Sequence, residues 1–140
     1  MRDAPLHAFI PSDRRQAVDR LLGGREVRSI RPLIGGASAA VMLRLDLDGE
    51  ACVLRAEGRP DGFRDPPRQY ACQSIAAAVG VAPALLASDA AARLSLSAFI
   101  ERGLEPPRAE KLAHTACAVR RLHEGQVFPP LVSYMDAVGA

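Results

Sequence analysis

Apolar side chains occupy every second position from Val41 to Leu47, and the positions between them are mostly polar. A period of two is typical of a strand with one buried face. Asp48-Gly49 follows, a dipeptide that favours a two-residue hairpin turn because both central positions adopt positive φ. The chain then returns along residues 50–55, so this segment is predicted to be a β-hairpin.

Three other segments have apolar residues at helical spacing, with start and stop signals at their ends. Ser12 or Asp13 is the expected cap of a first helix, and the glycines at 23–24 end it because glycine readily takes the left-handed turn. Asp65 is the expected cap of a second helix, which opens on two prolines. The third has its start signal in Glu105-Pro106-Pro107. The later helices are predicted over 66–79 and 107–123, and further strands over 26–33, 84–88 and 93–100.

The predicted order of elements is helix, three strands, helix, two strands, helix. Strands and helices do not alternate regularly, as they do in a parallel doubly wound sheet. We therefore predict an α+β fold in which a helix packs on a five-stranded antiparallel sheet and a helical segment follows. The chain divides into an N-terminal arm and helix over 1–25, a sheet unit over 26–102 and a final segment over 103–140.

The composition excludes several classes of function. The 140 residues are 49% apolar and 24% charged, as expected for a globular domain with one core. A net charge of +2 without clustered cations gives no reason to expect nucleic acid binding. No apolar run reaches the roughly 18 residues of a membrane span, and no signal pattern is present. We therefore expect a cytoplasmic protein with neither a nucleic acid nor a membrane as partner.

The cysteines and the arginine pairs have ordinary structural interpretations. Cys52, Cys72 and Cys117 are far apart and odd in number, and we expect each to be reduced and buried as a small apolar residue. The arginine pairs at 14–15 and 120–121 fall on predicted helices. A solvated helix face is the expected place for both pairs.

Small residues precede the hairpin, in the segment 34–38 (sequence IGGAS), and the second hairpin strand ends in Arg55. This layout is typical of a loop that closes over nucleotide phosphates, with a cation on the next strand to reach them. Glycine lets backbone N–H groups approach an anion without a Cβ in the way. Structural roles are the alternatives: Gly35 and Gly36 as a tight connection, Arg55 as an exposed cation, and Ser38 as a cap of its own loop.

Four pieces of the chain are informative as a set because of their order and spacing. They are the loop at 34–38, the hairpin end Val53-Leu54-Arg55, the segment Gly80-Val81-Ala82-Pro83, and Phe99-Ile100-Glu101 followed by Leu122-His123-Glu124-Gly125. Together they resemble the aminoglycoside phosphotransferase and choline/ethanolamine kinase family, which has a protein-kinase-like fold. The resemblance covers about residues 26–130. It implies a kinase-like N-lobe over 26–102 and the start of a C-lobe over 103–140.

The resemblance implies a role for the loop and for the strand cation. Gly35, Gly36 and Ser38 would lie over the phosphates of ATP, where Ser38 could donate a hydrogen bond to a phosphate oxygen. Arg55 would hold the α- and β-phosphates. Most of the wider superfamily has lysine there, so arginine keeps the charge but changes the reach and the geometry.

The resemblance also implies a hinge that binds the base of the nucleotide. Phe99, Ile100 and Glu101 belong to this hinge, whose backbone would meet adenine. A solvated carboxylate is the alternative interpretation of Glu101. ATP and Mg²⁺ are the implied cofactors, and a small molecule with a hydroxyl group is the implied acceptor of phosphate.

Other residues that the family uses are missing from this sequence. The helix 66–79 should offer an acid to the strand cation, but the candidate positions hold Gln69 and Gln73, and the nearest acid is Asp65. The family's catalytic acid lies in a His-x-Asp loop, and a later Asp binds the metal. None of the three histidines has Asp two positions later. We therefore assign no catalytic and no metal-binding residue.

Three hypotheses follow from these observations. In the first, the chain is the N-terminal portion of an enzyme that transfers the γ-phosphate of ATP to a small-molecule hydroxyl, and it has no turnover alone. In the second, it is a non-catalytic interaction or nucleotide-binding module that self-associates or binds a partner through an exposed interlobe face. In the third, it is a truncated remnant, because the tail at 129–140 has no clear terminating element.

Overall fold

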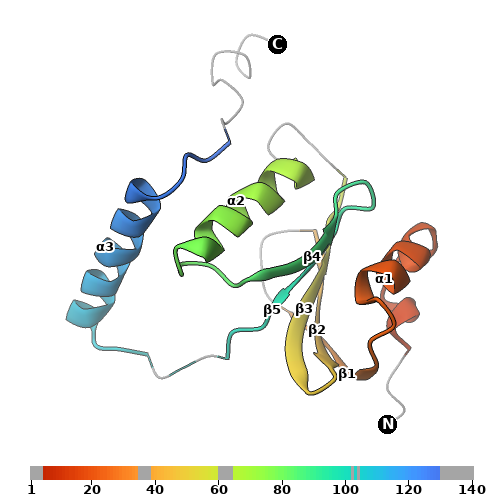
Figure 1. Cartoon of the computed structure of the whole chain (residues 1–140). Helices are drawn as coiled ribbons and strands as arrows, with labels where there is room; N and C mark the ends of the chain where they lie inside the picture. Colours follow the sequence, from red (N-terminus) through yellow and green to blue (C-terminus); the bar gives the residue numbers. More distant parts are fainter. Residues whose placement is uncertain (1–4, 35–38, 60–64, 102, 104, 130–140) are drawn as a thin grey trace.

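The computed structural model describes residues 5–34, 39–59, 65–101, 103 and 105–129 (Figure 1). These residues form an α+β fold with a five-stranded antiparallel sheet, which confirms the predicted fold class at this level. The elements in chain order are the 3₁₀ turns η1 (Leu6–Ala8) and η2 (Ser12–Arg14), the helix α1 (Arg15–Leu22), the strands β1 (Val27–Pro32), β2 (Val41–Leu47) and β3 (Glu50–Ala56), the helix α2 (Pro66–Ala78), the strands β4 (Leu85–Asp89) and β5 (Leu94–Ala98), and the helix α3 (Arg108–Glu124).

The strands lie in the order β1-β2-β3-β5-β4, and each neighbouring pair is antiparallel. β2 and β3 form the predicted hairpin, in which Leu43 pairs with Leu54. Asp48 (φ 55°) and Gly49 (φ 90°) both occupy the left-handed region, as the two-residue turn requires. β5 pairs with β3 on its other side, so the chain that passes through α2 and β4 returns to the centre of the sheet.

The hydrophobic core lies on one face of this sheet, beneath α1. Every second residue of β2, β3 and β5 points to that face, and Val18 and Leu22 of α1 are buried with them. Burying one such side chain stabilises the fold by about 1.5–3 kcal/mol. α1 and α2 lie on opposite sides of the sheet (Figure 1). The strand residues with the most deeply buried side chains are Leu43, Leu45, Leu47, Cys52, Leu54, Leu94 and Leu96.

The predicted helix caps are only partly correct. α1 begins directly after η2, so Ser12 and Asp13 lie in that 3₁₀ turn, and the N-cap residue Arg14 makes no capping bond through its side chain. Asp65 does occupy the N-cap position of α2, but its side chain makes no capping hydrogen bond. At the other end of α1, Gly23 (φ 61°) has the expected left-handed conformation.

The arginine pair 14–15 is only partly on a solvated helix face: Arg15, the first residue of α1, is exposed as predicted, but the prediction is wrong for Arg14. Arg14 is only 9% exposed, and its Nη1 donates a hydrogen bond of 2.6 Å to the carbonyl oxygen of Glu57. The N-terminal segment folds back against the sheet at this point. A buried cation persists there because its guanidinium has a hydrogen-bond acceptor.

The helix α3 lies apart from the sheet (Figure 1), and some of its residues line a cavity with Gly80 and Val81, in the turn after α2. None of its residues is buried; Leu112 is 63% exposed, and Val119 is exposed as well. Cys117 is also exposed on this helix, Cys72 is half-buried and Cys52 is buried. The expectation of burial is therefore confirmed for Cys52 and wrong for Cys117, because apolar neighbours in sequence do not bury a residue on a helix that has no buried side chain.

Matched truncations of two leucines test this difference in burial. We predict that Leu45→Ala, beneath α1, lowers the free energy of unfolding by about 2–5 kcal/mol, because it removes buried methyl groups and leaves a cavity. Leu112→Ala on α3 should change it by less than about 0.5 kcal/mol. Urea unfolding followed by circular dichroism measures both values. Equal losses in the two variants would show that α3 is packed in solution.

Candidate functional site

The face of the sheet opposite α1 carries the alternate, more polar residues of β2, β3 and β5. Because successive strand residues point to opposite faces, the buried leucines direct Arg55 and Ser95 to this second face. Cross-strand pairing places Met42 on one side of Arg55 and Ser95 on the other. A cavity of about 390 Å³, here named the sheet cleft, opens on this face. Its lining residues are Met42, Val53, Arg55, Gln73, Pro83, Ser95, Ser97, Ala98, Phe99 and Ile100.

The predicted strand cation, Arg55, lines this cleft and has an acidic partner. Its Nε lies 2.6 Å from Oε1 of Glu57, and its Nη2 donates a hydrogen bond of 3.4 Å to Oε2 of the same carboxylate. Glu57 directly follows β3 and was missed by the sequence analysis, which sought the acid on α2. A signal was present, because residues i and i+2 of an extended chain share one face of the sheet.

α2 brings two glutamines to the same cation. Gln69 and Gln73 line a second cavity, of about 280 Å³, together with Arg55 and Glu57. Gln73 also lines the sheet cleft, so the two cavities adjoin. Asp65 is exposed at the start of α2 and lines neither of them. The two glutamine positions were therefore placed correctly by the sequence, although neither supplies a charge.

The predicted hinge residues lie at the edge of the sheet cleft and are tied to β2 and β3. The backbone N–H of Phe99 donates a hydrogen bond of 3.0 Å to the carbonyl oxygen of Ala51. Arg44 places its Cζ 4.4 Å from the centre of the Phe99 ring, and its Nη2 donates to Oε1 of Glu101 at 2.7 Å. Ile100 is 65% exposed. Glu101 is thus paired with a cation, and Arg44 is a residue of this region that the sequence analysis missed.

The predicted phosphate loop is bracketed by β1 and β2. The residues Gly35, Gly36 and Ser38 lie outside the described part of the chain. On the near side of that segment, the N–H of Leu33 donates a hydrogen bond of 2.9 Å to the carbonyl oxygen of Met42. Met42 also lines the sheet cleft. The end of β1 and the start of β2 therefore both lie next to this cleft.

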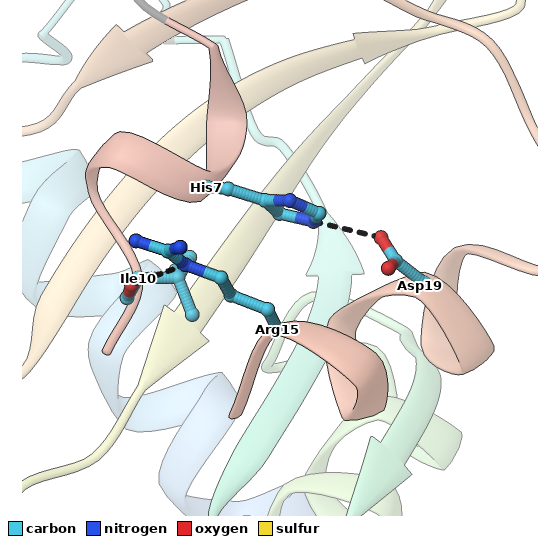
Figure 2. A network of polar contacts seen from close by, with 4 residues as sticks. All are labelled: His7, Ile10, Arg15 and Asp19. Carbon is cyan, nitrogen blue, oxygen red and sulfur yellow. Dashed lines mark hydrogen bonds and ion pairs between the residues drawn. The ribbon is translucent and has the colours of Figure 1, made fainter. Parts of the chain in front are cut away.

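A separate polar network lies on the α1 side of the molecule (Figure 2). Nε2 of His7 and Oδ1 of Asp19 are 2.9 Å apart, and Nε of Arg15 donates a hydrogen bond of 3.4 Å to the carbonyl oxygen of Ile10. Figure 2 shows His7 and Asp19 pointing toward one another across the gap between η1 and α1. These contacts hold the N-terminal segment on α1, and none of the predicted site residues takes part in them.

Burial shifts the titration of two groups near the sheet. Burial first and the nearby carboxylate of Glu57 second raise the pKa of Tyr70 to about 12, although Arg55 and Ser95 act in the opposite direction. Burial also raises the pKa of the Cys52 thiol. Tyr70 lines the 280 Å³ cavity, so its neutral phenol faces the Arg55–Glu57 pair.

We also searched the described part of the chain for metal-binding groups and membrane-spanning helices, and compared the chain with known proteins. Within the described residues, no three His, Cys, Asp or Glu side chains gather closely enough to hold a metal ion. No helix in that part of the chain has both the length and the apolar character needed to cross a membrane. Comparison of the chain with protein-family models, with curated proteins and with solved structures found no match. The site is interpreted from its geometry.

The shifted tyrosine makes stability depend on pH in the alkaline range. The unfolded chain loses the Tyr70 proton near pH 10, whereas the folded chain keeps it to about pH 12, so folding stability should fall between these values. Relative to Tyr70→Phe, we predict that the wild-type protein loses about 2–3 kcal/mol of unfolding free energy over this range. Urea unfolding below pH 10 and near pH 12 tests the prediction. Parallel pH curves for the two proteins would contradict it.

Proposed function

We propose that this chain binds ATP as a kinase-like N-lobe of the aminoglycoside phosphotransferase and choline/ethanolamine kinase type. The observation that carries the proposal is the sheet cleft, which gathers Arg55 from β3 with Phe99 and Ile100 from the segment after β5. In an enzyme of this type, the γ-phosphate of ATP passes to a hydroxyl of a small molecule, such as an aminoglycoside or a choline-like amino alcohol.

The cleft has parts that suit different parts of the nucleotide. Met42, Val53 and Ala98 offer apolar surface to an adenine ring, and Ile100 stands exposed at the edge. Arg55 offers a planar guanidinium, which pairs with phosphate through several N–H donors at once. The cavity of about 390 Å³ also falls within the roughly 300–1,000 Å³ that is usual for small-molecule sites. These features support a nucleotide as the ligand.

We expect nucleotide binding without turnover from these 140 residues. Phosphoryl transfer needs an acid that orients the acceptor hydroxyl and ligands that hold Mg²⁺. The sequence has no His-x-Asp, and the described residues include no group of three metal-ligating side chains. The proposal therefore assigns no chemical step to Mg²⁺ or to a catalytic residue of this chain.

Replacement of the cation tests the proposed site. Arg55→Ala should weaken the binding of a fluorescent ATP analogue by at least about tenfold, since a hydrogen bond to a charged group contributes about 1.5–3 kcal/mol. Fluorescence anisotropy measures the affinity. Arg28→Ala on β1 is the matched control, because it removes the same charge from an exposed position that does not line the cleft. Equal affinities of the wild-type and Arg55→Ala proteins would overturn the proposal.

A second candidate function, a non-catalytic interaction module, is favoured by the open face of α3. Leu112 and Val119 are exposed on this helix, and no residue of α3 is buried. Exposed apolar side chains on such a helix often mark an interaction site, and self-association would cover them.

Sedimentation velocity tests the interaction module. The wild-type chain should associate as its concentration rises, and the double variant Leu112→Ser, Val119→Ser should stay monomeric, because the substitutions remove the apolar contact surface. Leu86→Ser on β4 is a control for an exposed apolar residue elsewhere. A wild-type protein that remains a monomer at all concentrations tested would count against this second function.

A further inference from the structure

We propose that Glu57 is the positioning residue for Arg55 in the nucleotide site, in place of an acid on α2. This inference rests on the proposed function, and it names the residue that orients the phosphate-binding cation. It also departs from what the family resemblance implies, because that resemblance places the acid on the helix. Three observations carry it: the geometry of the ion pair, the way in which Glu57 is fixed, and the chemistry of α2.

The ion pair holds one edge of the guanidinium and leaves the other available. Glu57 contacts Nε at 2.6 Å and Nη2 at 3.4 Å. A guanidinium has five N–H donors in a fixed plane, so Nη1 and one N–H of Nη2 are not used by the carboxylate. The side chain of Glu57 is 7% exposed and that of Arg55 is 38% exposed. The acid is therefore at the buried end of the pair, and the cation extends toward the cleft.

Glu57 is itself fixed by two other parts of the fold. Its N–H donates a hydrogen bond of 2.9 Å to the carbonyl oxygen of Arg93, in the turn before β5. Its carbonyl oxygen accepts the 2.6 Å hydrogen bond from Nη1 of Arg14, a residue that is itself buried. Backbone bonds on both sides of Glu57 restrict its main chain. A carboxylate on so restricted a backbone is well placed to orient a longer side chain.

α2 has no group that could take the same part. The sequence of Pro66–Ala78 contains neither Asp nor Glu. Gln73 is the residue of α2 that shares both cavities with Arg55, but it carries no charge, and its Nε2 donates a hydrogen bond of 3.2 Å to the carbonyl oxygen of Pro83. The acid that pairs with the cation thus comes from the residue that follows β3, and α2 contributes no charge to the pair.

The proposal is tested by measuring nucleotide affinity in variants that remove the acid at Glu57 and place one at Gln73. With the fluorescent ATP analogue as probe, Glu57→Gln should weaken binding about three- to tenfold, because a free Arg55 side chain must be ordered when the phosphates bind. Glu57→Gln combined with Gln73→Glu returns an acid to the cavity that Arg55 lines, and it should restore the affinity to within about twofold. Gln73→Glu alone is the matched control. A purely structural role of Glu57 would not be rescued in this way.

A direct readout of the arginine side chain accompanies the binding assay. In the protein without nucleotide, the Nε–H resonance of Arg55, whose Nε is buried beside Oε1 of Glu57, should exchange slowly with water in the wild type and faster in Glu57→Gln, because the neutral amide no longer holds the guanidinium in this buried position. Glu57→Asp keeps the charge on a shorter side chain and should give intermediate values in both assays. It serves as the test variant if Glu57→Gln does not fold, as judged by circular dichroism.

The possible outcomes separate this inference from the proposed function. Weaker binding by Glu57→Gln with rescue by the double variant supports the inference. Unchanged or tighter binding by Glu57→Gln, while Arg55→Ala still loses affinity, overturns the positioning role and leaves the nucleotide site standing. If the wild-type protein binds no nucleotide, the proposed function fails, and the positioning role in that site fails with it.

Discussion

The leucine-rich face formed by β2, β3 and β5 is the constraint on which the other elements depend. Leu45, Leu54 and Leu96 are fully buried beneath α1. Because successive residues of a strand point to opposite faces, the residues next to these leucines in sequence lie on the other face of the sheet. The polar character of the sheet cleft is therefore a consequence of core formation, and a shift of register by one residue would bury Arg55 beneath α1.

The same constraint explains how residues distant in sequence come to share a site. Pairing of β3 with both β2 and β5 sets Met42, Arg55 and Ser95 in one row across the sheet. α2, packed on this face, then adds Gln73 from above the row. Buried ionic groups are tolerated only where they are paired or hydrogen-bonded, and the acid of Glu57 and the guanidinium of Arg14 both meet this condition.

Much of this arrangement was predictable from local patterns, and the exceptions share a cause. The alternation before Asp48 predicted the hairpin, which places Arg55 near the end of its second strand, whereas the hinge role of residues 99–101 came from the family resemblance alone. The burial of Arg14 and the exposure of Cys117 were not predictable, because each depends on whether a distant element packs against its helix. Glu57 was missed for another reason. The acid that pairs with Arg55 was expected on α2, whereas it lies two residues further along the same chain segment.

The hairpin of β2 and β3 has a consequence for the order of folding. Its strands are joined by two residues, so their pairing closes a very short loop, whereas pairing of β3 with β5 must first close a loop that contains all of α2 and β4. Local contacts of the first kind form on a timescale of about 1–10 μs, and long-range contacts form more slowly. Arg55 and Glu57 both belong to the early hairpin and its immediate extension. The two residues can therefore pair early in folding, before β5 and α2 add their residues to the sheet cleft.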